Sequence, residues 1–176
     1  RDLGNLANAG VLPLAESAYL LIEFERRQIT VDPVSVVEEL RAADWRPIVA
    51  HPEFVPGLRD DMELAHRLVE SGALLQSTGM SVTGHFGPRT QECVEALLDA
   101  GLVHFVASDA HDVDSRRPGL RRARRAIAKR WGEVTADRLT HINPQAVLEN
   151  RDIPPSRSDK PSLLVPHSIE GHRSTS

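Results

Sequence analysis

The sequence predicts an α/β fold in which parallel strands alternate with helices, and three observations lead to this class. Four short apolar stretches are each followed by a stretch of helical period. Polar residues that suit catalysis come directly after apolar stretches, as they do at the carboxyl ends of strands in (β/α) barrels. The 176 residues are 40% hydrophobic and 26% charged, which is typical of a globular domain with its own core. We therefore expect one domain that forms part of a (β/α) barrel.

The first predicted strand covers residues 18–24 and carries Glu23 near its end. Two interpretations of Glu23 remain open, a site residue and a surface or ion-paired carboxylate. A helix is predicted over 33–43, because Asp32 precedes a proline at the first helical position and can serve as the N-cap.

The second predicted strand, 47–50, runs straight into His51. An amphipathic helix is predicted over 60–71, and Gly72 ends it. A third strand follows at 73–76. The histidine is therefore expected at the carboxyl end of a buried strand.

A loop rich in glycine and hydroxyl groups is predicted over 77–87. Its backbone amides could hold a phosphate, although the loop matches no phosphate-binding pattern. His85 in this loop either reaches the site or is simply exposed. The next helix is predicted over 88–100, closed by Gly101.

The fourth predicted strand, 103–107, ends in a carboxylate and an imidazole two positions apart. If Asp109 and His111 are extended, their side chains share one face with Cα atoms roughly 6.5 Å apart, and both could reach one metal ion. The alternative is ordinary loop chemistry in which Ser108 or Asp109 caps the next helix. His51 at the end of a second strand favours a site over a cap.

Basic residues are concentrated between residues 116 and 130. Most of them are expected on the solvated face of a helix over 119–131. Arg116 and Arg117 differ, because they closely follow His111 and could act as anion clamps over the same opening.

The last predicted helix begins at Asn143-Pro144 and ends near Glu149. Residues 154–176 are rich in Pro, Ser and charged residues, so we expect a disordered tail there.

Composition excludes several classes of function. A net charge of −4 argues against general nucleic-acid binding, and no apolar run approaches the roughly 20 residues that a membrane span needs. The start of the chain lacks the hydrophobic region of a signal peptide, so we expect a cytoplasmic protein without direct membrane insertion. Cys93 is the only cysteine; it excludes an internal disulfide or a thiolate cluster, and it is expected in the core.

Four strand–helix units do not close a barrel. We therefore expect N-terminal units to be missing from this chain, and an open sheet edge that further chain or a homo-oligomer would cover.

Several motifs, in this order, resemble one family: the PHP-type metal-dependent phosphoesterases, and within it the bacterial protein-tyrosine phosphatases of capsular and exopolysaccharide operons. The similarity covers residues 12–153. It rests on Tyr19-Leu20-Leu21-Ile22-Glu23-Phe24, Pro47-Ile48-Val49-Ala50-His51-Pro52-Glu53, Gln76, Ser81, Gly84-His85-Phe86-Gly87, Val103 through Ser108-Asp109-Ala110-His111, and Asn143-Pro144.

The resemblance implies a distorted (β/α)7 barrel with two or three metal ions, commonly manganese, at the carboxyl ends of the strands. Residues 1–153 would then be the C-terminal portion of a PHP domain whose front portion supplies further ligands. It implies His51, Asp109 and His111 as metal ligands, Arg117 or Arg116 as the phosphate-binding arginine, and Glu53 as a supporting residue. Phe54 stands where the family pattern has an arginine.

The implied function is metal-assisted hydrolysis of phosphotyrosine on a protein, with a membrane tyrosine autokinase of polysaccharide export as the partner. Oxygen and nitrogen ligands suit manganese, iron, magnesium or zinc alike. Two alternatives remain: a non-catalytic remnant or interaction module, and another PHP phosphoesterase that acts on a small phosphate ester.

Overall fold

The computed structural model of the chain describes residues 12–24, 31–112, 114 and 118–153. The expected tail at 154–176, together with Arg116 and Arg117, lies outside these residues. Within the described part, no helix combines the length and the apolar composition that crossing a membrane requires.

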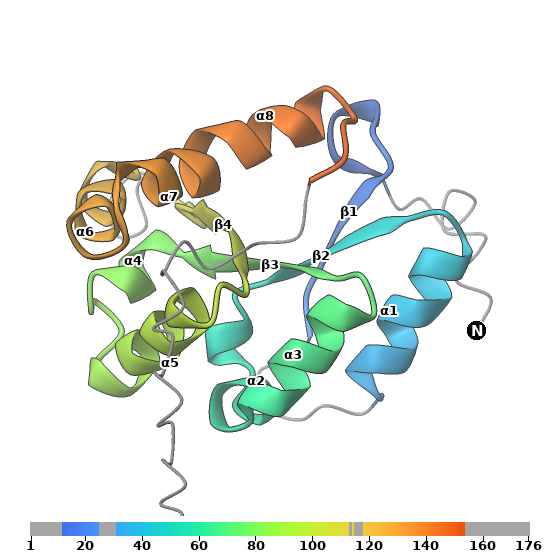
Figure 1. Cartoon of the computed structure of the whole chain (residues 1–176), viewed down its shortest axis with the longest axis horizontal. Helices are drawn as coiled ribbons and strands as arrows, with labels where there is room; N and C mark the ends of the chain where they lie inside the picture. Colours follow the sequence, from blue (N-terminus) through green and yellow to red (C-terminus); the bar gives the residue numbers. More distant parts are fainter. Residues whose placement is uncertain (1–11, 25–30, 113, 115–117, 154–176) are drawn as a thin grey trace, which may run out of the picture.

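Four parallel strands form one sheet in the order β1-β2-β3-β4 (Figure 1). Their bounds are Tyr19–Ile22, Arg46–Ala50, Leu74–Thr78 and Val103–Ala107. Each strand pairs with the next one in the sequence, which confirms the predicted alternation of strands and helices. Because all four strands run the same way, their carboxyl ends meet at one edge of the sheet, here called the carboxyl edge.

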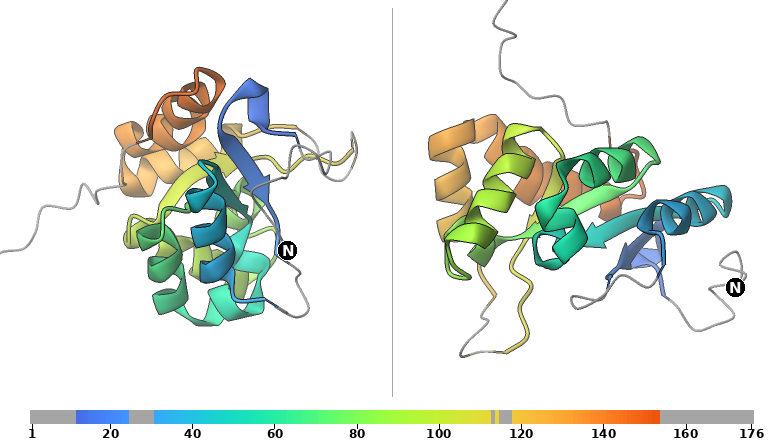
Figure 2. Two further views of the ribbon diagram at one scale, coloured as in Figure 1. Left: turned by 90° about the vertical axis from the view of Figure 1, so that its right-hand side faces the viewer. Right: turned by 90° about the horizontal axis from the view of Figure 1, so that it is seen from below.

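Helices α1 (Pro33–Ala42), α3 (Met62–Glu70) and α5 (Pro88–Asp99) lie together on one face of the sheet (Figures 1 and 2). Apolar side chains of these helices pack against outward-facing strand residues such as Val49 and Leu75, which are both fully buried. This layer is the main core, and it fixes the strands whose ends carry the candidate site.

The opposite face of the sheet is covered by α8 (Asn143–Leu148) and the strand-proximal turn Leu14–Glu16 (Figure 1). A smaller apolar cluster forms there from Tyr19, Ile48, Phe105 and Val147. Strand residues therefore alternate between two buried layers, as expected for a parallel sheet.

The predicted helix over 60–71 corresponds to α3, and the residues before it form a further short helix that was not predicted, α2 (Pro56–Asp60). Asp61 separates them, since its φ of −135° and ψ of 95° are extended and its carboxylate accepts hydrogen bonds from the amides of Glu63 and Leu64. The predicted start at residue 60 is two residues too early, because Asp61 is the N-cap of α3.

Two further segments differ from the prediction. The loop over 77–87 contains a helical turn, α4 (Gly79–Val82), and the turn after α6 (Arg121–Trp131) contains α7 (Glu133–Asp137) and a π-helical segment, Arg138–Ile142, that leads into α8. Both are short and lack the 3.6-residue apolar period over several turns, so the sequence pattern did not reveal them.

Candidate metal centre at the carboxyl edge of the sheet

The three predicted ligands and Glu23 all lie just beyond the carboxyl ends of strands. Glu23 follows β1, His51 follows β2, and Asp109 and His111 follow β4. All of them therefore belong to the carboxyl edge, with β3 between the two groups. The sheet thus brings together residues that are far apart in the sequence.

His51 forms a pair with Glu23. The Nε2 atom of His51 is 3.1 Å from Oε1 of Glu23, and the histidine is only 3% exposed. Its backbone amide donates to the carbonyl of Gln76 at 2.7 Å, which ties the residue to β3. The Nδ1 atom is buried and has no hydrogen-bond partner among the described residues.

Glu53 supports the turn that carries His51. Its side chain is fully buried, and Oε1 accepts a hydrogen bond from the amide of Thr78 at 2.8 Å. Burial raises the pKa of the Glu53 carboxyl, and the Thr78 amide opposes this increase. The contact joins the turn after β2 to the end of β3, so Glu53 stabilises the position of the turn that carries His51.

Asp109 and His111 form the second pair. The Nδ1 atom of His111 is 2.8 Å from the backbone oxygen of Asp109 and 3.7 Å from its Oδ1. The carboxylate is 16% exposed and the imidazole 57% exposed. When Nδ1 carries the proton and donates to the backbone oxygen, the Nε2 lone pair of His111 remains available to a metal.

The extended conformation predicted for Asp109 is wrong. Its φ is 50°, in the left-handed region, so the chain turns at this residue. Aspartate tolerates this conformation better than most residues, and the turn brings the imidazole of His111 back over Asp109. The two side chains approach each other through a turn and not along a strand.

His51 also has a left-handed backbone, with φ of 34°. Such conformations cost about 1–3 kcal/mol each and occur often at functional sites. Two predicted ligands at the ends of two different strands thus have left-handed backbones, as do four described residues outside the site, Ala15, Glu16, Asp44 and Asn150.

The two pairs do not merge into one cluster. Across the described residues, no group of three or more His, Cys, Asp or Glu side chains is arranged to hold a metal ion. Arg116 and Arg117, the predicted phosphate-binding residues, lie outside the described part of the chain. The geometry therefore provides two donor pairs at one edge of the sheet.

The sequence analysis left Glu23 between two interpretations, and the structure gives it His51 as a partner. The pairing of Glu23 with His51 follows from the strand order, because β1 and β2 are neighbours in the sheet. Ile22 is in register with Val49 across the parallel strands β1 and β2, so the residues that follow both strands must lie close together.

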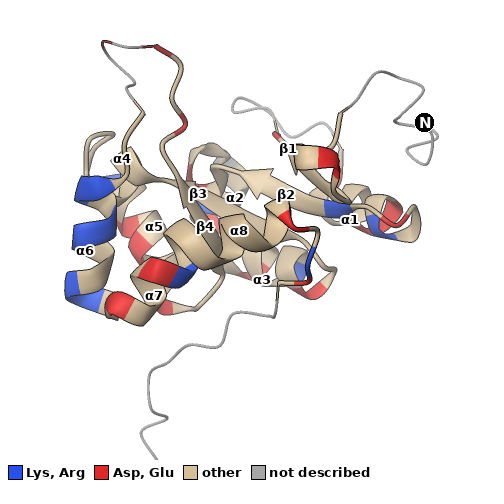
Figure 3. Cartoon of the chain, turned by 90° about the horizontal axis from the view of Figure 1, so that it is seen from above, with Lys and Arg blue, Asp and Glu red and all other residues tan. Residues whose placement is uncertain are grey.

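A cavity of about 420 Å³ lies beside the carboxyl edge, between α4, the loop after β4 and the first turn of α6. It is lined by the basic residues Arg121 and Arg122, by His85 and by Asp114. Neither arginine forms an ion pair with another described residue, and Figure 3 shows the basic residues gathered along α6. This cavity is suited to an anionic part of a ligand.

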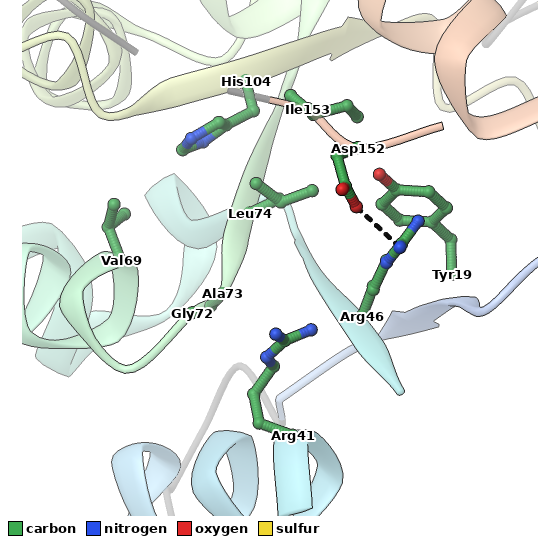
Figure 4. A pocket seen from close by; sticks show the side chains of 10 residues that line it. All are labelled: Tyr19, Arg41, Arg46, Val69, Gly72, Ala73, Leu74, His104, Asp152 and Ile153. Atoms are coloured by element: carbon green, nitrogen blue, oxygen red, sulfur yellow. Dashed lines mark ion pairs between the residues drawn. The ribbon is translucent and has the colours of Figure 1, made fainter. Parts of the chain in front are cut away.

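A second cavity, of about 240 Å³, lies at the opposite end of the sheet, where the strands begin (Figure 4). Its arginine side chains have partners. Arg46 forms an ion pair with Asp152 at 2.6 Å and covers the ring of Tyr19, and Arg41 donates to the backbone oxygen of Trp45 at 3.1 Å. These contacts tie the amino ends of β1 and β2 to Asp152, next to the last described residue.

Comparison with known proteins relates most of the chain to one family. The family model "Capsular polysaccharide synthesis, CpsB/CapC" matches residues 3–149. Among curated relatives, tyrosine-protein phosphatase YwqE of Bacillus subtilis is 34% identical over 149 residues, which is 85% of this chain and 58% of the relative. Tyrosine-protein phosphatase CpsB of Streptococcus pneumoniae is 28% identical over 151 residues, which is 83% of this chain and 62% of the relative.

A putative tyrosine-protein phosphatase CapC of Staphylococcus aureus is 35% identical over 111 residues, 63% of this chain and 44% of the relative. The chain thus spans between 44% and 62% of the length of these relatives.

A similar fold occurs in a crystal structure from work on YwqE of Bacillus subtilis and CpsB of Streptococcus pneumoniae, which are described as metal-dependent tyrosine phosphatases. The TM-score is 0.80 at 32% sequence identity, over 89% of this chain and 64% of the other. The matched fold and the extent of the family match lead to one conclusion: this chain belongs to the CpsB/CapC family of capsular polysaccharide synthesis proteins.

Proposed function

We propose that the chain carries part of the catalytic site of a metal-dependent protein-tyrosine phosphatase. The observation that carries the proposal is the placement of two donor pairs, Glu23 with His51 and Asp109 with His111, at one edge of a parallel sheet. The names of the relatives, which are tyrosine-protein phosphatases, support the reaction and the substrate class.

The donor set fits a divalent metal. Imidazole nitrogens and carboxylate oxygens suit manganese, and also iron, magnesium or zinc, and no cysteine takes part. His51 is buried with an unpartnered Nδ1, and the backbones of His51 and Asp109 are left-handed, a conformation that occurs often at functional sites. His51, Asp109 and His111 would hold the metal, and Glu23 would be a fourth donor.

When bound, such metal ions polarise the phosphoryl group and lower the pKa of a water molecule that attacks it. The chain's own residues then position the metal ligands and stabilise the charge of the phosphoryl group. Glu53 fixes the turn that carries His51, and Arg117 or Arg116 would bind the charged phosphoryl oxygens. Arg121 and Arg122 add positive charge to the neighbouring cavity.

We infer that the sheet is part of a distorted (β/α) barrel, with residues 1–153 as the C-terminal portion of a PHP domain. An apolar cavity of about 450 Å³ lies between the sheet and α8, bordered by Ile48, Phe105 and Val147. Incomplete filling of this face supports the barrel, because side chains of further strands would fill the interior of a closed barrel.

The proposed substrate is a phosphotyrosine protein of the polysaccharide export system, a membrane tyrosine autokinase whose phosphorylated segment is cytoplasmic. The family's link to capsular polysaccharide synthesis supports this choice.

Phosphate release from a phosphotyrosine peptide tests the reaction. The manganese-loaded chain is expected to release phosphate from this peptide and not from the matching phosphoserine peptide. Asp109→Ala is expected to lower the rate at least about tenfold, and Glu70→Ala on the exposed surface of α3 is expected to leave it unchanged. Equal phosphate release with and without manganese would contradict the proposal.

One observation favours a second candidate, a non-catalytic interaction module of the same family. The donors lie in two pairs, with no cluster of three among the described residues. In that case the chain would bind the phosphotyrosine peptide without releasing phosphate. A small phosphate ester as the true substrate would appear in the same assay as a faster reaction than that of the peptide.

A further inference from the structure

Four aromatic rings form a continuous chain of contacts along the carboxyl edge. The ring centroids of His51 and Phe54 are 5.7 Å apart with an interplanar angle of 56°. Phe54 meets Phe86 edge-to-face at 5.0 Å and 85°, and Phe86 meets His85 at 5.2 Å and 86°. The contacts lead from a proposed metal ligand to a residue that lines the 420 Å³ cavity.

Local structure fixes the position of both phenylalanines. Phe54 ends a short 3-10 turn, Pro52–Phe54, and its amide donates to the carbonyl of His51 at 3.0 Å. Phe86 lies between Gly84 and Gly87, which both have positive φ. Gly84 has φ of 77°, which strains any other residue, and a Cβ there would also lie 2.6 Å from Oε1 of Gln91 and displace that side chain.

Neither phenylalanine is a core residue. Both rings are partly exposed, and neither belongs to the two apolar clusters that hold the sheet and helices together. Apolar ring surface is therefore left in contact with water beside His51. Covering such surface is favourable, and a third ring adds edge-to-face or offset contacts at centroid separations of about 4.5–7 Å.

We propose that Phe54 and Phe86 form an aryl platform, a surface that binds the aromatic ring of the substrate while its phosphoryl group lies at His51. The proposal rests on the phosphatase function proposed above and names the feature that selects an aryl phosphate. The rings of His51 and Phe54 are in contact at a centroid separation of 5.7 Å, so a phosphate ester held at a metal centre beside His51 would have its own ring within reach of this surface. An alkyl phosphate gains nothing there.

The platform also explains Phe54, which stands where the family pattern has an arginine that could contact the phosphate. A side chain with a positive charge at this position would bind the phosphoryl group of any ester, whereas a phenyl ring distinguishes esters by their organic part. Phe54 thus contributes to specificity and not to binding of the phosphate itself.

Binding of two phosphonates tests the platform without depending on turnover. Phenylphosphonate and methylphosphonate present the same anion, and only the first has a ring. Calorimetric titration of the manganese-loaded chain is expected to show tighter binding of phenylphosphonate. In Phe54→Leu and in Phe86→Leu the preference is expected to fall about 3- to 10-fold through weaker phenylphosphonate binding, with methylphosphonate unchanged.

Two control variants separate the platform from a general structural effect. Phe54→Tyr keeps the ring and is expected to keep the preference. Trp45→Leu removes a partly exposed aromatic residue at the opposite end of the sheet and is also expected to keep it. Manganese stoichiometry and thermal unfolding of each variant confirm that the metal centre and the fold are retained.

The possible failures are distinguishable. If wild type binds both phosphonates equally, or if its preference survives in both leucine variants, the platform is contradicted and the phosphatase proposal stands. If the leucine variants lose manganese, Phe54 and Phe86 only brace His51, and the platform is again contradicted. If neither phosphonate binds to the loaded wild type, the anion site is absent, and both proposals fail together.

Discussion

The imidazole of His51 faces the carboxylate of Glu23 across the ends of the first two strands, with Nε2 and Oε1 3.1 Å apart. The histidine is buried and the carboxylate is 57% exposed, so the pair lies at the rim of the sheet and is open on one side. In such a pair the two side chains either contact each other, as they do here, or move apart so that both bind a cation between them.

Glu23→Ala is therefore expected to weaken manganese binding by about 10- to 100-fold, because it removes one donor and the partner that orients His51. Calorimetric titration with manganese measures the effect. Glu70→Ala, an exposed glutamate on α3, is the matched control and should bind as wild type does. Unchanged affinity in Glu23→Ala would show that this carboxylate is only an ion-pair partner.

The effect of a substitution at Asp109 on stability is expected to depend on how well the new residue tolerates a left-handed backbone. Its backbone is left-handed, so Asp109→Val should lower the free energy of unfolding by about 1–2 kcal/mol, since a β-branched residue fits this conformation poorly. Asp109→Gly removes the same carboxylate without that penalty. Urea unfolding of the metal-free variants measures the difference. If both substitutions destabilise the chain equally, the left-handed turn at Asp109 does not form in solution.

Because His104 is buried, we expect the stability of the chain to depend on pH. The residue is 1% exposed, and burial lowers its pKa from 6.5 to about 4. Between these values the unfolded chain binds a proton that the folded chain does not, so stability falls as the pH decreases from 6.5 to 4. The loss attributable to this residue is at most about 3 kcal/mol.

A variant isolates this contribution of His104. The Nδ1 atom of His104 accepts a hydrogen bond from the amide of Leu75 at 3.2 Å, and the side-chain oxygen of an asparagine can take its place. His104→Asn is therefore expected to flatten the acid limb of a plot of unfolding free energy against pH. An identical acid limb in both proteins would contradict a neutral, buried His104.

Cys93 is expected to be unreactive in the folded chain. It is 6% exposed, and burial raises the pKa of its thiol to about 11, so almost no thiolate is present at pH 8. Labelling with a thiol reagent at pH 8 should proceed only as the chain unfolds in urea, in step with the loss of helical circular dichroism. Rapid labelling of the native protein would contradict this packing.

The parts of the fold that could be predicted are those in which local pattern and packing agree. The strand ending at Ala107 and the helix beginning at Pro33 have the predicted bounds to within two residues, because an apolar run or a capped amphipathic run determines each of them. Buried Cys93 was also predicted correctly.

The errors arose where structure depends on one residue or on distant partners. A single N-cap, Asp61, sets the start of α3 and separates it from α2, a short helix that periodicity did not reveal. The left-handed turn at Asp109 depends on one φ angle, which no sequence period encodes. The pairing of Glu23 with His51 requires the strand order, and the contact between Phe54 and Phe86 joins two loops whose positions follow only from the folded sheet.

The most direct test of the central claim is the metal content of the purified chain, measured by elemental analysis for wild type and for a His51→Ala, Asp109→Ala, His111→Ala triple variant. The account predicts near-stoichiometric metal in wild type after incubation with manganese and dialysis, and loss of that metal in the triple variant. Equal metal content in the two proteins, or none in wild type, would contradict a metal centre at the carboxyl edge of this sheet.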